Sequence, residues 1–372
     1  MDAEVPQIIF DSKGVCNYCK VHDQMEAEYP TGERGKAILE AKIKEIKEAG
    51  RGKAFDIIIG VSGGCDSTYM CKMAKEYGLR VLAAHFDNTW NSAIATQNIY
   101  TTLKKLDIEL FTIVVNNEEY DEMLRAFLLS GTPDIDCPTD IGLAATMYMA
   151  AEKYGVKYQW DGHSFRTEGS APLGFVYMDQ MYIKSLMEQH SRSRRARFES
   201  YPTLWLSQQM KWWLFTRIQK VRPLYWVDYH KEKVKKELAE TLGWKWYGGH
   251  HLENRYTAFL HSYYYPRRYG RDIRVVADSA RVRSGQLSRE EGLATIAEPF
   301  QPDPQTVQMI QKRLGFSDKE LEDLIAAPHK TFRDYRTYKK TFEKMRPFFF
   351  VLQKFDLISR SFYVKYTSKT EI

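Results

Sequence analysis

The segment Ile57–Ser67, with the sequence IIIGVSGGCDS, constrains the fold more than any other part of this chain. A short apolar run ends at Gly60, a Ser-Gly-Gly turn follows, and a helical pattern begins near Asp66. Glycines let the backbone approach an anion and turn successive N–H groups towards it, and the following helix adds its free N–H groups and the positive end of its dipole. The segment therefore predicts a strand, an anion-binding loop and a helix, with Ser62 and Ser67 as hydroxyl donors.

The same order of strand and helix repeats over residues 55–160. The predicted strands are Phe55–Val61, Leu79–Phe86, Ile108–Val115 and Val156–Trp160, and the predicted helices are Asp66–Tyr77, Ser92–Leu106, Glu119–Leu129 and Asp140–Tyr154. Short apolar runs bounded by glycine are typical of buried parallel strands, and their alternation with helices indicates a doubly wound sheet. We therefore predict an α/β fold with a parallel sheet.

Helical patterns occupy both flanks of this region. Ala37–Ala49 has apolar residues at helical spacing, and after about Gly174 the sequence is mostly helical, as in Leu204–Lys220 and Asp228–Leu242. Further helices are predicted near residues 252–264, 273–283, 288–296, 304–314 and 319–325. We therefore expect three parts: a Cys-containing segment with a helix at residues 1–50, the loop-containing domain at 51–185 and a helical, basic region at 186–372.

Composition excludes several classes of protein and divides the charge unevenly. Hydrophobic residues make up 44% and charged residues 27%, and no apolar run approaches the roughly 20 residues of a membrane span, which excludes disordered, fibrous and membrane-spanning classes. Five cysteines and the absence of a secretory-signal pattern predict a cytoplasmic protein without a membrane partner. The first 186 residues carry 19 Lys/Arg and 27 Asp/Glu, and the rest carry 35 and 21. The basic half indicates an anionic partner, either a nucleic acid, a nucleotide sugar or another phosphorylated compound.

Two cysteine patterns suggest chemistry. Cys16 and Cys19 form a C-x-x-C pair with His22 three residues on, which could supply part of a zinc site, with two reduced thiols as the alternative. Cys137 precedes a predicted helix, and a helix N-terminus lowers the pKa of a thiol. The alternative interpretation of Cys137 is a residue that only shapes its surroundings.

Polar residues also follow the predicted strands. His85 and Asp87 end the second strand, Asp161–His163 follow the fourth, and Arg222 lies in the segment VRPL. A purely structural histidine is the alternative for His85.

The segment YGGHHLENRYTAFLHSYYYPRRYGRDIR concentrates histidine, glutamate and arginine. Its candidates for acid–base, metal-binding or anion-binding roles are His250, His251, Glu253, Arg267, Arg268 and Arg274. A solvated helix start with salt bridges is the alternative.

The form S-G-G-x-D-S resembles the PP-loop of the N-type ATP pyrophosphatases, whose fold is adenine nucleotide alpha hydrolase-like. It is neither a G-x-x-x-x-G-K-[ST] loop nor a G-x-G-x-x-G fingerprint. Members of this superfamily include GMP synthetase, NAD synthetase, asparagine synthetase and enzymes of tRNA thiolation or lysidine formation. The resemblance implies that the loop holds the β,γ-pyrophosphate of ATP while a substrate oxygen attacks the α-phosphate.

Together with FDSKGVCNYC, DCPTDIG and the His-Glu-Arg segment, the loop makes the chain similar to the WbpG-type N-acetyl sugar amidotransferases, to about Ile296. The resemblance implies an ATP pyrophosphatase-type carbon–nitrogen ligase. It would adenylate an acetamido group of a UDP-linked diacetamido uronic acid and replace its oxygen with ammonia. The acetamidino product would enter lipopolysaccharide O-antigen or a related surface polysaccharide, and a separate glutaminase with a cyclase-like barrel would supply the ammonia.

The chain departs from its relatives at two places. The additional N-terminal C-x-x-C of many relatives is missing, which puts a zinc site at Cys16 and Cys19 in doubt. Asp140 stands where some thiolating enzymes have a second cysteine after Cys137, which argues against an iron–sulfur cluster.

Residue roles follow from the resemblance. The residues expected to bind ATP are Gly60, Ser62, Gly63, Gly64, Asp66, Ser67, His85, Asp87, Asp161 and Gly162. The expected catalytic residues are Asp66, Cys137, Asp140, His163, His251 and Glu253. The expected ligands of the sugar nucleotide are Arg222, His250, His251, Glu253, Arg267, Arg268 and Arg274. Asp66 would lie near Mg²⁺.

Two other functions are compatible with the sequence. A tRNA-modifying PP-loop enzyme would explain the basic half and the run SRSRRAR, and we rank it below the nucleotide-sugar enzyme. A non-catalytic ATP-binding module would bind ATP without releasing pyrophosphate. The exact sugar, the general base and the oligomeric state, a homo-oligomer included, stay open.

Overall fold

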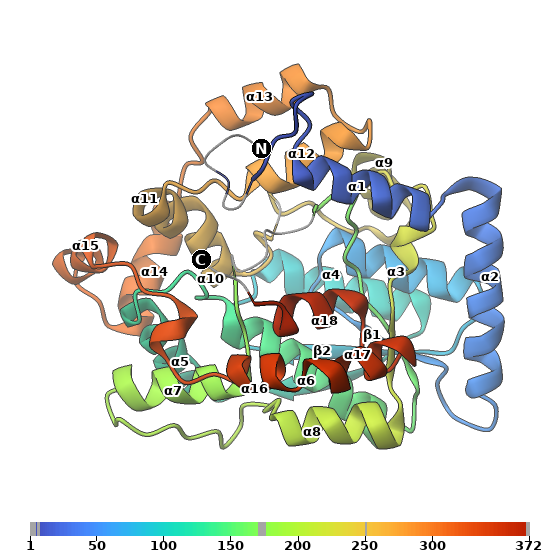
Figure 1. Cartoon of the computed structure of the whole chain (residues 1–372), viewed down its shortest axis with the longest axis horizontal. Helices are drawn as coiled ribbons and strands as arrows, with labels where there is room; N and C mark the ends of the chain where they lie inside the picture. The colour runs from blue at the N-terminus through green and yellow to red at the C-terminus, as the bar shows by residue number, and fades with distance from the viewer. Residues whose placement is uncertain (1–4, 6–7, 170–175, 250, 370–372) are drawn as a thin grey trace.

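A five-stranded parallel sheet forms the centre of the molecule (Figure 1). The structure is a computed structural model that describes residue 5 and residues 8–169, 176–249 and 251–369. The strands are β1 (Ile57–Gly60), β2 (Val81–Asp87), β3 (Glu109–Val114), β4 (Tyr158–Trp160) and β5 (Gln219–Val221). Their order is β3-β2-β1-β4-β5 and every neighbouring pair is parallel, which confirms the predicted α/β class.

Helices make up most of the remaining chain. Those of the first half are α1 (Asn17–Glu28), α2 (Gly32–Ala49), α3 (Cys65–Glu76), α4 (Ala93–Leu106), α5 (Asn117–Leu129), α6 (Cys137–Lys153) and α7 (Gln180–His190). Those of the second half are α8 (Leu206–Lys211), the π-helix η1 (Trp212–Thr216), the 3-10 helix η2 (Pro223–Tyr225), α9 (Lys231–Leu242), α10 (Arg255–Phe259), the π-helix η3 (Leu260–Tyr264), α11 (Tyr265–Tyr269), α12 (Arg274–Arg283), α13 (Arg289–Ala297), α14 (Pro304–Leu314), α15 (Asp318–Ala326), the 3-10 helix η4 (Phe332–Asp334), α16 (Lys339–Lys344), α17 (Arg346–Lys354) and α18 (Arg360–Thr367). The mostly helical C-terminal part is thus confirmed. In the described ranges, no helix combines the length and the apolar composition that a membrane crossing requires.

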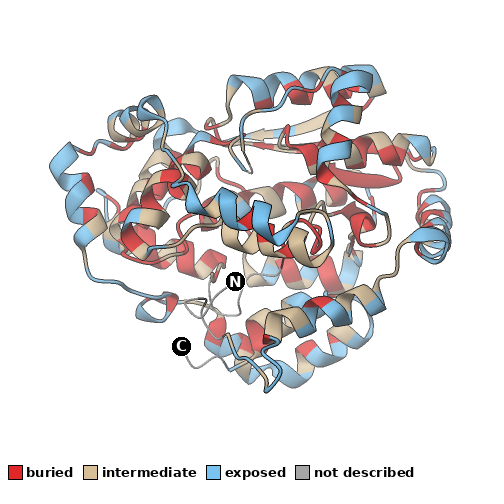
Figure 2. Ribbon diagram, turned by 90° about the horizontal axis from the view of Figure 1, so that it is seen from above, coloured by how far each residue is buried: buried red, intermediate tan, exposed pale blue. Residues whose placement is uncertain are grey.

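Both faces of the sheet are covered, because successive strand residues point to opposite sides. Ile57 and Ile59 pack into one buried cluster with α2, α3, α4 and α9, whereas Ile58 belongs to the other cluster with α5, α6 and α7. Figure 2 shows the buried residues gathered around the sheet and the inner faces of these helices. This two-sided burial explains why the strands consist of continuous apolar runs.

The prediction of one helix over Leu204–Lys220 is wrong at its C-terminal end. The helix α8 passes into η1, and Arg217 then adopts a left-handed backbone conformation with φ 51°, which ends it. The next residues form β5, whose Gln219 N–H donates to the carbonyl of Lys157 at 2.8 Å. An open edge of β4 offers backbone partners that a three-residue strand can use, and helical periodicity cannot reveal them.

The C-terminal helices α16, α17 and α18 have no counterpart among the predicted elements. They lie over α6 in Figure 1 and pack through aromatic rings. The ring of Phe362 lies 5.0 Å from Trp213 of η1 and 5.6 Å from Phe342 of α16. The end of the chain is thereby packed into the buried cluster on the α5, α6 and α7 side of the sheet. The proposed division at residues 50 and 185 stays a prediction.

Removing a side chain from the central strand should test this core. We expect Ile58→Ala to lower the free energy of unfolding by about 2–5 kcal/mol, because Ile58 is fully buried and a cavity would remain. Ile38→Ala on the surface of α2, where 38% of the residue is exposed, is the matched control and should cost less than about 1 kcal/mol. Chemical denaturation of both variants measures the difference, and equal losses would contradict this account of the core.

Candidate functional site

The Ser-Gly-Gly loop lies at the carboxyl end of β1 and leads directly into α3. Gly63 has φ 80°, and a Cβ atom there would lie 2.2 Å from the carbonyl oxygen of Ala95, so glycine is required at this position. Its own carbonyl accepts hydrogen bonds from Trp244 Nε1 at 2.9 Å and Asn98 Nδ2 at 3.2 Å. Gly64 is the N-cap of α3. The loop is therefore held from outside by the carbonyl of Gly63, and the Gly64 N–H donates to Ser62 Oγ at 3.2 Å, at the N-terminus of the helix, where an anion is favoured.

Asp66, in the first turn of α3, is bound by two residues of the second half of the chain. Lys231 Nζ lies 2.9 Å from its carboxylate, and the hydroxyl of Tyr229 donates to it as well. Burial acts to raise the pKa of Asp66, but Lys231 and Tyr229 outweigh it and lower that pKa. Glu168 lies 3.9 Å from the same ammonium group. Sequence reasoning missed Lys231 and Tyr229, since nothing in the pattern separates Lys231 from the other lysines of α9.

Glu253 reaches the loop from the opposite side. Ser62 Oγ donates to Glu253 Oε1 at 3.4 Å, and Ser92 N–H donates to the Glu253 carbonyl at 2.8 Å. The other carboxylate oxygen, Oε2, is buried and has no hydrogen-bond partner within the described ranges. A buried acceptor of this kind is costly unless a donor or a cation satisfies it. Glu253 thus brings a carboxylate to the loop through Ser62, with one oxygen left unpaired in the described structure.

His251 pairs with Glu253, at 3.8 Å between Nδ1 and Oε1. Desolvation acts to lower the pKa of His251, but the carboxylates of Glu253 and Glu168 raise it to about 9. The same interaction holds the pKa of Glu253 below its usual range despite burial. At neutral pH the pair is therefore an imidazolium and a carboxylate. The neighbouring candidate His250 lies outside the described residues.

His85 supports the loop. Its Nδ1–H donates to the carbonyl of Val61 at 2.8 Å, and Asn91 Nδ2 donates to its Nε2 at 3.2 Å. Burial lowers the pKa of His85, which agrees with a neutral ring in this arrangement. Asp87, two residues on, accepts a hydrogen bond from Thr89 N–H at 2.9 Å. Both residues end β2, beside the strand that carries the loop.

Asp161 and Arg222 form a network at the carboxyl ends of β4 and β5. Arg222 Nε donates to Asp161 Oδ2 at 3.2 Å, and Lys220 Nζ lies 3.5 Å from the same oxygen. Burial acts to raise the pKa of Asp161, but these two cations lower it well below its usual range. His163 is hydrogen-bonded to the hydroxyl of Tyr225 at 2.9 Å and to the carbonyl of Gly169 at 3.0 Å. Both of its ring nitrogens are thus engaged, so His163 positions the loop after β4.

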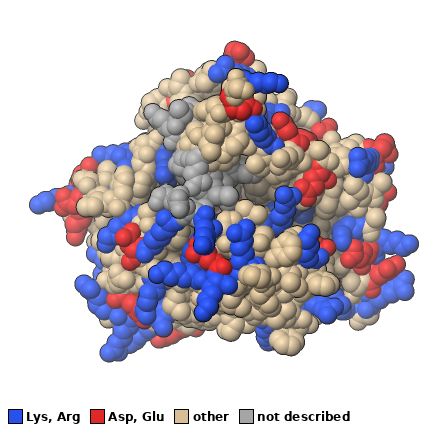
Figure 3. Space-filling model, in the orientation of Figure 1, with Lys and Arg blue, Asp and Glu red and all other residues tan. Residues whose placement is uncertain are grey.

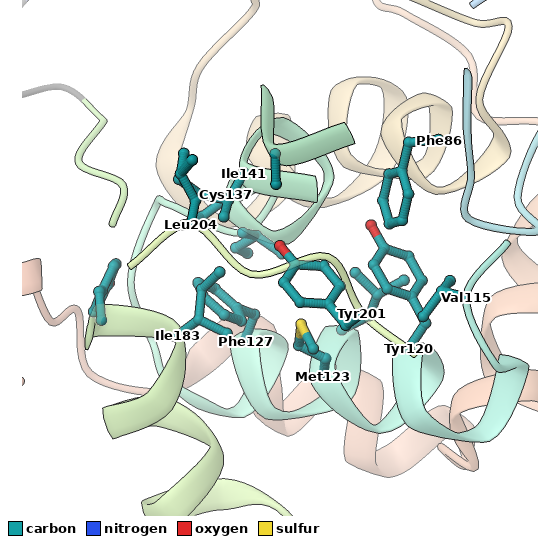
Figure 4. Close-up of a cluster of buried hydrophobic side chains, with 14 of the residues drawn as sticks. Phe86, Val115, Tyr120, Met123, Phe127, Cys137, Ile141, Ile183, Tyr201 and Leu204 are labelled. Carbon is teal, nitrogen blue, oxygen red and sulfur yellow. The ribbon is translucent and has the colours of Figure 1, made fainter. Parts of the chain in front are cut away.

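Cys137 begins α6 but lies in an apolar cluster with Ile141, Tyr201 and Leu204 (Figure 4). Burial raises the pKa of its thiol well above the usual range, contrary to the effect expected of a helix N-terminus. Low polarity outweighs the helix dipole here, and the thiol stays protonated. Asp140 lies one turn further along α6, and its side chain is accessible to solvent although protein surrounds it. Desolvation and the nearby carboxylate of Asp136 raise the pKa of Asp140 to about 7.

Three arginines predicted to bind the sugar nucleotide have other partners. Arg267 pairs with Glu322 at 2.8 Å, and Arg274 pairs with Asp272 at 2.6 Å. Arg268 is buried and donates to backbone carbonyls, among them Pro328 at 3.0 Å and Gly131 at 3.2 Å. Their bidentate chemistry is used to hold α11, α12 and α15. Their role in substrate binding stays a prediction.

The metal candidates differ in how well their surroundings fit. The sulfur atoms of Cys16 and Cys19 lie 3.4 Å apart, yet no group of three His, Cys, Asp or Glu side chains suited to a metal occurs in the described part of the chain. Mg²⁺ usually needs only one or two carboxylates besides phosphate oxygens and water. Asp66, the carboxylate expected near Mg²⁺, lies beside the loop, and its two oxygens accept hydrogen bonds from Tyr229 and Lys231 in this structure.

Comparisons with known proteins give two kinds of match. A family profile described as "LPS biosynthesis protein WbpG-like, C-terminal domain" matches residues 253–346. The tRNA-specific 2-thiouridylases MnmA of Colwellia psychrerythraea and Proteus mirabilis are each 31% identical, over 126 and 125 residues, which is 30% of this chain and 34% of theirs. The chain therefore covers about a third of the length of these curated relatives. The solved structure of NMN synthetase from Francisella tularensis is 14% identical, covering 77% of this chain and 95% of that one, with a TM-score of 0.33.

The two parts of the site, the glycine loop and the segment that contains Glu253, lie in regions with different similarities. The loop of the first half has the S-G-G-x-D-S form of the PP-loop. The matched C-terminal domain begins at Glu253, the residue that contacts Ser62 of the loop. Residues 253–346 are thus similar to a WbpG-like C-terminal domain, and a stretch of 126 residues is similar to part of the MnmA thiouridylases.

Proposed function

We propose that the protein is an ATP pyrophosphatase-type carbon–nitrogen ligase that converts an acetamido group of a UDP-linked diacetamido uronic acid into an acetamidino group. The acetamido oxygen attacks the α-phosphorus of ATP, and the bond to the β-phosphate oxygen breaks to release pyrophosphate. Ammonia then adds to the activated carbon, loses its proton and expels AMP. The product would serve a surface polysaccharide such as lipopolysaccharide O-antigen.

The hydrogen bond between Ser62 and Glu253 carries this proposal. It joins the phosphate loop, which the superfamily shares, to the first residue of the domain that narrows the family to the WbpG type. A carboxylate beside the phosphate loop can interact both with the phosphates of ATP and with the molecule that attacks them. The family-specific domain thus supports a function in the chemical step as well as in binding.

The residues of the loop supply most of the electrostatic stabilisation. On this proposal, the β,γ-pyrophosphate binds at the N-terminus of α3, where Gly64 is the N-cap and Ser67 lies in the first turn. Lys231 and the protonated His251 add positive charge on either side. Mg²⁺, held near Asp66 and by the phosphates, would neutralise the charge of the triphosphate.

Glu253 is the better proton acceptor of the two groups considered for the attack by ammonia. His251 carries its proton at neutral pH because its pKa is raised to about 9, so it cannot serve as a base there. The pKa of Glu253 is lowered, and its Oε2 is without a partner in the described part of the chain. A carboxylate beside the loop can therefore take the proton that leaves the attacking nitrogen.

A tRNA-modifying enzyme is the second candidate. The similar MnmA proteins are named as tRNA-specific 2-thiouridylases. Figure 3 also shows basic side chains gathered around α16. Lys340 and Lys344 of that helix are exposed. A non-catalytic ATP-binding module is a third candidate. A separate glutaminase with a cyclase-like barrel belongs to the sugar proposal as the source of ammonia.

Pyrophosphate release should separate the three functions. We expect release from ATP and an ammonium salt only when a UDP-linked diacetamido uronic acid is present, because the acetamido oxygen is the attacking group. Asp66→Ala should abolish it. Release with tRNA in place of the sugar would support the second candidate, and ATP binding without any release would support the third.

Replacing Glu253 by glutamine should separate a chemical role from a binding role. Glu253→Gln keeps the shape and a donor–acceptor pair but removes the base, so we expect kcat for pyrophosphate release or amidine formation to fall about a hundredfold while ATP still binds. Glu240→Gln on the exposed face of α9 is the matched control and should leave both unchanged. Equal kcat values for the Glu253→Gln variant and the wild type would contradict the assigned role.

The affinity for ATP should depend on the charge of His251. Its folded pKa is raised to about 9, so the imidazolium is present below that pH and is lost as the pH rises through it. We expect the Kd for ATP to increase several-fold between pH 8 and pH 10 in the wild type. His251→Gln should bind ATP more weakly at pH 8 and show a flatter profile. Calorimetric titration measures both, and it avoids the titration of ammonia that would affect rates.

A further inference from the structure

A cavity of about 350 Å³ lies between α6, the ends of β1 and β4, and the C-terminal helices. Its volume is in the range of small-molecule pockets. Aromatic rings of Trp213, Phe342, Phe362 and Tyr366 form part of its wall. Three of these four rings come from α16 and α18, which the sequence patterns did not predict. The C-terminal helices therefore complete a pocket and do not merely cover the core.

The cavity meets the phosphate site at one end. Gly60, the last residue of β1, and Gly162, just after β4, both border it. A Cβ atom on Gly60 would lie 2.9 Å from Met147 Sδ, so a side chain there would narrow this end. A ligand in the cavity can therefore present one group to the beginning of the loop. This is where the α-phosphorus of ATP must be attacked if the proposed function is correct.

The charged groups of the cavity are mostly carboxylates. Asp140, Asp161 and Asp179 border it, and its one lysine in the described part of the chain, Lys220, pairs with Asp161. In the described part of the chain, no basic side chain without a carboxylate partner borders the cavity, so it offers little to hold a polynucleotide or the diphosphate of a sugar nucleotide. Carboxylates accept hydrogen bonds from hydroxyl and amide N–H groups, which a sugar ring with acylated amines provides.

Trp160 leaves a donor unused beside the cavity. Trp160 is only 1% exposed, and its indole Nε1–H has no hydrogen-bond partner in the part of the chain that the structure describes. A buried donor without a partner costs free energy, and a ligand in the cavity recovers it when the indole turns so that Nε1–H reaches the cavity. The carbonyl oxygen of an acyl group is a neutral acceptor of the required kind.

We infer that this cavity is the acceptor pocket for the N-acylated sugar ring, with the apolar face of the ring against the aromatic wall and an acyl carbonyl towards Trp160 and the loop. The inference rests on the proposed function and adds the place and the determinants of substrate recognition. It makes Asp140 and Phe362 residues that determine specificity, and it leaves the nucleotide part of the substrate outside the cavity.

Binding of simple sugars to the full chain tests the pocket. The probes are N-acetyl-D-glucosamine and N-acetyl-D-mannosamine, with D-glucosamine as the unacylated control, followed by saturation-transfer difference NMR of the acetyl methyl group. We expect a signal from the wild type that falls at least fivefold in Ala144→Leu, whose larger side chain fills the cavity. Ala294→Leu, on the exposed face of α13, is the matched control and should keep the signal.

A second variant covers the case in which Ala144→Leu does not fold. Trp160→Phe keeps most of the ring and removes the donor, so we expect at least a threefold loss of signal while the unfolding temperature stays within a few degrees. An unchanged signal in the folded variants, or an equal signal from glucosamine, overturns the pocket. Pyrophosphate release is measured separately. A wild type that binds acetamido sugars but releases no pyrophosphate retains the pocket and loses the proposed function.

Discussion

The ion pair between Asp66 and Lys231 joins the two halves of this protein at the point on which its site depends. Asp66 stands in the first turn of α3, where the helix dipole and the glycine loop concentrate positive potential, and Lys231 begins α9 in the basic half. A buried carboxylate would be costly alone, and the lysine with the hydroxyl of Tyr229 makes it tolerable. The pair brings residues 165 positions apart into contact beside the glycine loop.

This arrangement explains part of the uneven charge distribution between the two halves of the chain. The acidic half provides the glycine loop and Asp66, and the basic half provides Lys231 beside Asp66 and His251 beside Glu253. Most of the other arginines considered for the site, such as Arg268 and Arg274, hold the helical region together. A high count of basic residues therefore reflects internal carboxylates and carbonyls as much as an anionic partner.

Prediction from sequence was accurate where local pattern and burial agree. The strands β1 to β4 are apolar runs bounded by turn residues, and the glycine loop has few alternative conformations, so both were foreseen. The strand β5 was missed because its pairing depends on the free edge of β4. The low thiol pKa expected for Cys137 fails for a similar reason, since neighbours from other elements bury the residue. Lys231, Tyr229 and the cavity under α18 are products of packing between distant segments.

The amino-acid sequence alone determined the α/β class, the phosphate loop and its glycines, because these depend on contacts between near neighbours and on backbone conformations that few residues adopt. The tertiary structure decided which carboxylates keep their charge, which cations reach the loop, and that the C-terminal helices close a pocket beside Gly60. These properties depend on desolvation and on distances of a few ångströms between segments far apart in the chain, and no local pattern records them.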